Sequence, residues 1–236
     1  MPDDWEEIEV GSGRMRLLVA APEGPGPRAA VVVICHAGGV DEFVQEMTRR
    51  VAQAGYLGAA PDLFHRQDPA DRSPLHLRDT EIIEDVSSTI ARLQSDDRVR
   101  HDAIGIVGFC LGGRIVYMMA GVSPQLKAAV SFYGGFSLSN RAGDPPAIDR
   151  LAGAYCPILG FFGEDDQNPS PEDMHKLDEQ LTRHDKPHAF HAYPNAGHAF
   201  MDFTNPKSYR EHAAQASWPL TLQFFEQHLG GVAVSP

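Results

Sequence analysis

One cysteine stands at the centre of the segment that is best suited to chemistry. Cys110 lies in Gly-Phe-Cys-Leu-Gly-Gly over residues 108–113, directly after the strand-like run 104–107. A strand that ends in Gly-x-nucleophile-x-Gly and opens into a helix is the pattern of a nucleophile elbow. The turn is strained, so small residues are needed two positions before and two after the nucleophile. The pattern predicts that Cys110 is exposed above a sheet, where the N–H groups of the next helix face a developing oxyanion.

Cys110 also has a structural interpretation, as a small buried apolar residue beside a phosphate-binding or dinucleotide-binding turn. Neither the spacing G-x-G-x-x-G nor the spacing G-x-x-x-x-G-K-[ST] fits this segment. The spacing of the glycines therefore favours a nucleophile over a phosphate-binding turn.

A thiol nucleophile needs a base within hydrogen-bonding reach and a carboxylate that orients the base. In the chain order nucleophile, acid, histidine, the candidates are Asp166, at the end of Gly-Glu-Asp-Asp, and His198, in Gly-His-Ala-Phe. Asp166 has an alternative as a turn or helix-capping carboxylate, and its neighbour Asp165 competes for the same role. His198 has an alternative as a solvent-facing loop residue.

The elements that must position these residues follow from apolar runs, helical periodicity and turn residues. Strands that alternate with helices predict an α/β fold with a mostly parallel sheet covered by helices on both faces. Active sites in such sheets lie beyond the carboxyl ends of the strands, where the three candidates fall. The predicted strands are 8–10 and 15–20, which form a hairpin, 29–35, 57–61, 104–107, 128–133, 157–162 and 188–193. The predicted helices are 42–54, 80–93, 113–121, 171–183 and 209–228, and the predicted loops are 65–78 and 136–154.

Length and composition fit one α/β domain over residues 1–236, which is long enough for a sizeable core. The net charge of -12 argues against a nucleic-acid or anionic-membrane surface. No apolar stretch reaches membrane-spanning length, and the acidic start is unlike a signal peptide. The three cysteines lack zinc-ligand spacing and predict neither a metal site nor a disulfide framework. We therefore expect a cytoplasmic protein that uses no cofactor.

Four segments resemble the dienelactone hydrolase (carboxymethylenebutenolidase) family, and the resemblance runs from the first apolar strand to the last amphipathic helix. These segments are 61–64, 108–113, 163–166 and 197–200. The resemblance implies an α/β-hydrolase fold and a Cys-Asp-His triad, matched here by Cys110, Asp166 and His198. It further implies hydrolysis of a cyclic ester through an acylated thiol. The backbone N–H groups of Leu111 and Ala37 match the two oxyanion donors of the family.

Two positions depart from the family members that act on dienelactone. Those members carry a Glu that helps to convert the thiol to thiolate, and this chain has His36 at that position. They also carry an Arg shortly after the catalytic histidine, and this chain has Asp202 there. His36 could favour the thiolate by its charge when protonated, or could only brace the oxyanion loop. Asp202 would repel an anionic substrate unless a cation such as Arg66, Arg72 or Arg78 compensates. We therefore predict a substrate other than dienelactone.

Three functions fit these residues. The first is hydrolysis of an ester or lactone through an acyl-thiol intermediate, and the second is thioester or general carboxylic ester hydrolysis by the same triad. The third is small-molecule binding without catalysis. We favour the first, because all three members of the triad are present. Candidates for lining the substrate pocket are His36, Phe64, Arg66, Tyr133 and Phe200, although the aromatic ones are also typical of a core. The predicted partner is a small-molecule ester or lactone, and the oligomeric state stays open.

Overall fold

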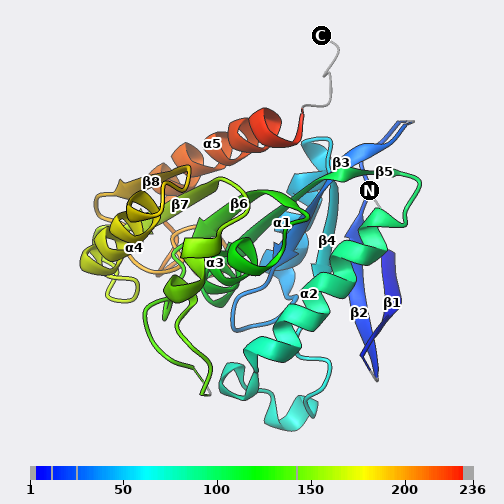
Figure 1. Ribbon diagram of the computed structural model, residues 1–236, viewed down its shortest axis with the longest axis horizontal. Helices are drawn as coiled ribbons and strands as arrows, with labels where there is room; N and C mark the ends of the chain where they lie inside the picture. The colour runs from blue at the N-terminus through cyan, green and yellow to red at the C-terminus, as the bar shows by residue number, and fades with distance from the viewer. Residues whose placement is uncertain (1–3, 12, 25, 142, 231–236) are drawn as a thin grey trace.

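A twisted eight-stranded sheet runs through the centre of the molecule (Figure 1). The computed structural model describes residues 4–11, 13–24, 26–141 and 143–230. The strands are β1 (Asp4–Val10), β2 (Gly13–Ala20), β3 (Arg28–Ile34), β4 (Leu57–Pro61), β5 (Val99–Phe109), β6 (Leu126–Phe132), β7 (Ile158–Gly163) and β8 (His188–Tyr193). Their order in the sheet is β1-β2-β4-β3-β5-β6-β7-β8. β2 pairs antiparallel with β1 and β4, and the strands from β4 to β8 pair in parallel.

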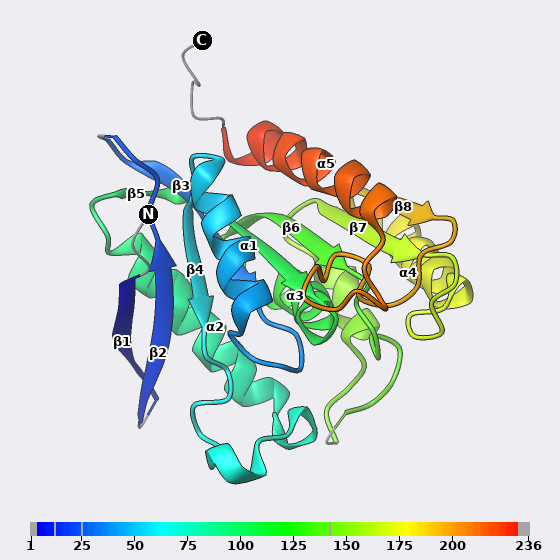
Figure 2. The same ribbon diagram turned by 180° about the vertical axis from the view of Figure 1, so that it is seen from behind.

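Helices cover both faces of the sheet, so the central strands are apolar along nearly their whole length. The helices are α1 (Glu42–Gln53), α2 (Asp79–Gln94), α3 (Leu111–Val122), α4 (Pro171–Arg183) and α5 (Glu211–Leu229). Figures 1 and 2 show α1 and α5 on one face and α2, α3 and α4 on the other. All residues of β3 after Arg28 are buried, as are all residues of β7. The prediction of an α/β-hydrolase fold with a mostly parallel sheet is confirmed.

The two predicted loops are not fully irregular, which corrects the sequence-based prediction. The segment 65–78 contains the 3-10 helices η1 (Pro69–Asp71) and η2 (Pro74–His76), and the segment 136–154 contains η3 (Ala147–Gly153). In η1 and η2 a proline follows a capping residue, Asp68 or Ser73, whose side chain accepts a backbone N–H. These helices are too short to give a periodic apolar pattern.

Two strands extend beyond their predicted bounds. β1 starts at Asp4 and β5 starts at Val99, in both cases well before the first residue that was predicted. The added residues of β5 include His101 and Asp102, which are exposed. Polar residues on an uncovered part of the sheet carry no apolar signal, so the strand pairing could not be predicted there.

Candidate active site

Cys110 occupies a sharp turn between β5 and α3. Its φ is 55°, which non-glycine residues rarely adopt. A Cβ at Gly108 would lie 2.2 Å from the carbonyl oxygen of Gly112, and a Cβ at Gly112 would lie 2.4 Å from that of Ile34. There is thus no room for a side chain two positions before or after Cys110. This is the steric requirement that the glycine spacing predicts for a nucleophile elbow.

The three cysteines differ in accessibility. Cys35 and Cys156 are buried, and their burial raises the pKa of each thiol to about 12. Cys110 is only partly buried and lines a cavity. Its partial exposure does not fit the interpretation of Cys110 as a packed core residue.

His198 lies against the carboxylate of Asp166. The distance from His198 Nδ1 to Asp166 Oδ2 is 2.8 Å, and the other carboxylate oxygen of Asp166 accepts the backbone N–H of Asn168 at 2.9 Å. Asp166 is 3% exposed, whereas the competing candidate Asp165 is exposed to solvent. The structure therefore brings Asp166, and not Asp165, to His198.

His198 also contacts the cysteine of the elbow. Burial lowers the pKa of the His198 imidazole, but side-chain hydrogen bonds to Asp166 and Cys110 and the charges of both partners outweigh burial and raise this pKa to about 10. Asp166 therefore lies on Nδ1 of His198, and Cys110 is the second group that raises the pKa of the imidazole. A thiol, an imidazole and a carboxylate from three distant parts of the chain thus lie together at this edge of the sheet.

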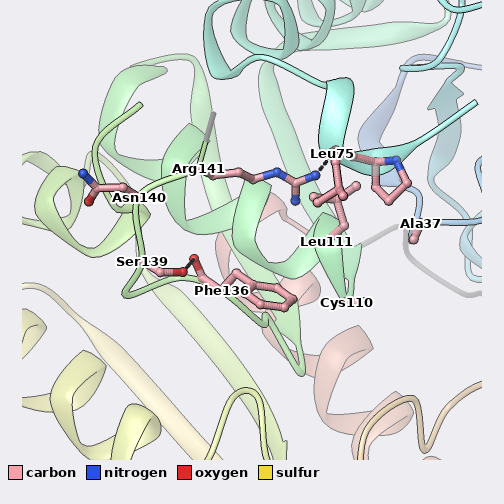
Figure 3. A pocket seen from close by; sticks show the side chains of 9 residues that line it. Ala37, Leu75, Cys110, Leu111, Phe136, Ser139, Asn140 and Arg141 are labelled. Carbon is pink, nitrogen blue, oxygen red and sulfur yellow. Dashed lines mark hydrogen bonds between the residues drawn. The ribbon is translucent and has the colours of Figure 1, made fainter. Parts of the chain in front are cut away.

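A cavity of about 310 Å³ opens beside Cys110 (Figure 3). Leu111, the first residue of α3, and Ala37, in the turn after β3, both line it. N–H groups in the first turn of a helix have no acceptor within that helix, so they are available to a ligand. The full lining is Ala37, Pro74, Leu75, Cys110, Leu111, Phe136, Ser139, Asn140 and Arg141.

None of the five residues predicted to line the substrate pocket belongs to the lining of this cavity. Tyr133 and Phe200 are buried and pack near the imidazole instead. The ring of Tyr133 meets the His198 ring edge to face at 5.2 Å and the Phe200 ring at 5.1 Å. These two aromatic side chains form part of the wall around His198, as core residues do.

Phe64 and Arg66 lie away from the cavity for separate reasons. Phe64 is 1% exposed and lies beneath the guanidinium of Arg72, which is 4.6 Å from its ring centre. Arg66 donates to Asp85 at 2.6 Å and to Glu84 at 2.9 Å, and these ion pairs hold it against α2. The structure therefore does not bring Arg66 to Cys110.

His36 contacts the start of α1. Its Nε2 lies 2.8 Å from Asp41 Oδ2, and Asp41 Oδ1 accepts the backbone N–H of Val44 as the cap of that helix. Burial raises the pKa of Asp41, but the hydrogen bond from His36 and those from backbone N–H groups outweigh it and lower this pKa. This contact favours the interpretation in which His36 braces the turn that carries Ala37.

The residues that sequence reasoning missed come from the two segments predicted as plain loops. Leu75 and Phe136 are 75% and 59% exposed, yet both line the cavity. Arg141, from the segment after β6, lines it as well. The sequence feature that could have pointed to this part of the pocket was the pair Gly134-Gly135, which marks a tight turn at the carboxyl end of β6.

Within the described part of the chain, no cluster of three or more His, Cys, Asp or Glu side chains is arranged to hold a metal ion. None of the helices in that part has the length and apolar character needed to span a membrane.

Comparisons with known proteins show which family and which solved structures this chain is similar to. The model of the dienelactone hydrolase family matches residues 15–229. A Synechocystis sp. protein with the provisional name carboxymethylenebutenolidase is 32% identical over 228 residues, which cover 89% of this chain and 91% of that protein. A Bradyrhizobium sp. protein with the provisional name 2-oxo-3-(5-oxofuran-2-ylidene)propanoate lactonase is 27% identical over 238 residues, with 97% and 95% covered. A crystal structure from Klebsiella pneumoniae, provisionally a dienelactone hydrolase, superposes with a TM-score of 0.91 at 28% identity and covers 96% of this chain and 99% of that one.

Proposed function

The chain belongs to the dienelactone hydrolase family and is a hydrolase of lactones or esters, and on this premise we propose that Cys110, His198 and Asp166 form its catalytic triad. One observation carries the proposal: His198 contacts Asp166 at 2.8 Å and is electrostatically coupled to Cys110, which lines an open cavity. The order of the three along the chain also agrees with the order typical of this fold.

The first half of the proposed reaction transfers the acyl group to sulfur. With the proton on His198, the Cys110 thiolate attacks the carbonyl carbon of the ester. The π electrons of the carbonyl move to its oxygen, and the backbone N–H groups of Leu111 and Ala37 stabilise this oxyanion. When the oxyanion collapses, the C–O bond to the alcohol breaks and His198 protonates the departing alkoxide. The acyl group is then a thioester of Cys110.

The second half returns the enzyme to its resting state. Neutral His198 accepts a proton from water while the water oxygen attacks the thioester carbonyl, and collapse of the second oxyanion expels the Cys110 thiolate. Asp166 accepts the Nδ1–H of His198 throughout, which fixes the tautomer and stabilises the imidazolium. A thiolate leaves a tetrahedral intermediate more readily than an amine anion does. We therefore expect activated esters and enol lactones to react, and amides to react poorly.

Acylation of Cys110 tests this proposal directly. A pulse of p-nitrophenyl acetate, quenched in acid, is expected to add one acetyl group per chain in the intact mass, and peptide mapping should place it on Cys110. Continued release of p-nitrophenol after this stoichiometric step separates an enzyme from a protein that only binds the ester. A Cys156→Ala variant serves as the control, because its buried thiol has no part in the mechanism. An acetyl group on another residue, or turnover with no acylated cysteine, would contradict the triad.

The substrate is proposed to differ from dienelactone. Asp202 stands where the dienelactone-specific members carry an Arg, and its Oδ1 accepts the N–H and the hydroxyl of Thr204 at 3.0 and 2.6 Å. A panel of dienelactone, simple lactones, p-nitrophenyl esters and acyl thioesters should show dienelactone as a poor substrate. A kcat/KM for dienelactone near the diffusional range would overturn this expectation. Faster turnover of thioesters than of oxygen esters would instead favour the thioesterase alternative.

A further inference from the structure

Within the described part of the chain, Arg141 has a guanidinium group without an ion-paired carboxylate, and it lines the same cavity as Cys110. Its Nη2 donates to the backbone carbonyl oxygen of Pro74. Its Nε is buried and has no hydrogen-bond partner among the described residues, and Arg141 forms no ion pair within that part of the chain. This is unusual in a protein with 32 acidic and 20 basic residues, where most cations can find an acid.

The acidic groups around Arg141 are already bound to other donors. Asp79 accepts both terminal nitrogens of Arg114 at 2.7 and 2.9 Å, and this pair is almost completely buried. Asp144, which pairs with Arg141 through the backbone only, accepts the N–H of Asp79 at 3.0 Å. Burial and the charge of Arg114 lower the pKa of Arg141, but a guanidinium remains charged at neutral pH. The charge of Asp79 acts on Arg141 from within its pair with Arg114, but within the described residues no carboxylate forms an ion pair with the Arg141 guanidinium that lines the cavity.

Apolar side chains line the cavity together with Arg141 and Cys110. Leu75 and Phe136 are two of the three exposed large apolar residues in the described chain, and both line the cavity. Figure 3 shows the Arg141 side chain reaching toward Leu75, with Phe136 below Arg141 in this view. Exposed apolar groups around a concave site favour a ligand with an apolar body. The lining of the cavity thus combines exposed apolar side chains with a cation.

The geometry also indicates which part of an ester enters this cavity. In the proposed mechanism His198 protonates the leaving alkoxide, so the alcohol part must lie toward His198. His198 is not among the residues that line the cavity, whereas Ala37 and Leu111 are. The cavity therefore accommodates the acyl part, which stays attached to Cys110 after the alcohol has left. A volume of about 310 Å³ is suited to a short acyl chain.

We propose that Arg141 determines specificity by binding a negatively charged group at the far end of the acyl chain, so that the preferred substrates are esters of short aliphatic dicarboxylic half-acids. The proposal rests on the function proposed above. The apolar methylene groups would lie between Leu75 and Phe136, and the terminal carboxylate would accept hydrogen bonds from the free positions of the guanidinium. Hydrogen bonds between charged groups in a partly buried site are the strong ones, so the preference should be large.

A pair of matched esters tests the proposal. p-Nitrophenyl hydrogen adipate and p-nitrophenyl hexanoate have acyl chains of the same length and the same leaving group, and differ in the terminal charge. After subtraction of the uncatalysed rate, the wild-type kcat/KM should be about 10- to 100-fold higher for the adipate ester. Arg141→Gln should bring the ratio of the two kcat/KM values close to one. Arg141→Lys should give an intermediate ratio, because lysine keeps the charge but lacks the planar guanidinium.

Arg183→Gln is the control, because it removes the same charge from the exposed last turn of α4 and should leave the ratio unchanged. A wild-type ratio at or below one would overturn the proposal, and so would an equal fall for both esters in Arg141→Gln. The latter result would mean that Arg141 acts on the thiolate and not on the substrate. If Arg141→Gln does not fold, the wild-type ratio and the ratio for Arg141→Lys still test the proposal. Absence of hydrolysis of both esters would instead count against the proposed function.

Discussion

Replacement of Cys110 by alanine is expected to lower kcat/KM for p-nitrophenyl esters by a factor on the order of 10⁴ or more, because it removes the sulfur on which the acyl intermediate is proposed to form. The fold should survive, since Cys110 is only partly buried and the substitution leaves Gly108 and Gly112 of the turn unchanged. Steady-state kinetics measures the loss, and thermal unfolding should give a melting temperature close to that of the wild type.

Cys110→Ser is the matched variant for this experiment. Serine keeps the elbow and one hydrogen-bond donor but does not ionise beside an imidazole as a thiol does, so its activity should lie far below that of wild type. Retention of wild-type activity by Cys110→Ala in a folded protein would exclude Cys110 as the nucleophile. Equal activity of the serine variant and wild type would show that a preformed thiolate is not needed.

The nucleophile elbow could be predicted from sequence because its determinants are local. Gly108 and Gly112 are required by contacts with neighbouring backbone within the strand–turn–helix unit and the adjacent strand. Such contacts involve only the strand, the turn and the sheet that buried apolar strands already imply. The same reasoning applied to His198, since chain order and the position after β8 placed it on the edge where Cys110 lies.

The acid and the pocket were harder to predict, since they depend on where loops meet in space. Asp165 and Asp166 are adjacent in sequence, and only the turn after β7 decides which carboxylate is buried against His198. Leu75 and Arg141 come from two segments that are distant in the chain and touch through the carbonyl of Pro74. No periodic pattern records such a contact, so the sequence suggested Arg66, which binds α2 instead.

The residues that react and the residues that select the substrate lie on different kinds of element. The parts that hold the reacting atoms lie at the ends of buried strands, where backbone pairing fixes their positions. The parts that select the substrate lie on connections with short 3-10 helices, such as η2, and exposed side chains such as Phe136. Loops of this kind can change without loss of the core. This division explains why the family of the chain is clear while the substrate we propose differs from the one that gives the family its name.

Replacement of Asp166 by asparagine is expected to lower kcat by about 10³- to 10⁴-fold, because the amide cannot both fix the Nδ1–H tautomer and stabilise the imidazolium. The volume of the side chain is conserved, and the amide oxygen of the variant can still accept the N–H of Asn168 that Asp166 Oδ1 accepts at 2.9 Å. Asp165→Asn is the control, since the same change at the exposed neighbour should alter kcat less than about twofold. An equal loss in both variants would mean that the turn after β7, and not the carboxylate, is what matters.

The pH dependence of the Asp166→Asn variant separates an electrostatic role from a structural one. The carboxylate helps to raise the pKa of His198 to about 10, so its removal should lower this pKa toward the ordinary value of histidine. A raised pKa stabilises the protonated form at every pH between the two values. In the wild type the imidazolium beside Cys110 should therefore persist across neutral pH. Alkylation of Cys110 by iodoacetamide should then be fast at pH 7 in the wild type and slower in the variant. The same alkylation rate in both proteins would show that Asp166 does not support the charged pair, even if kcat falls.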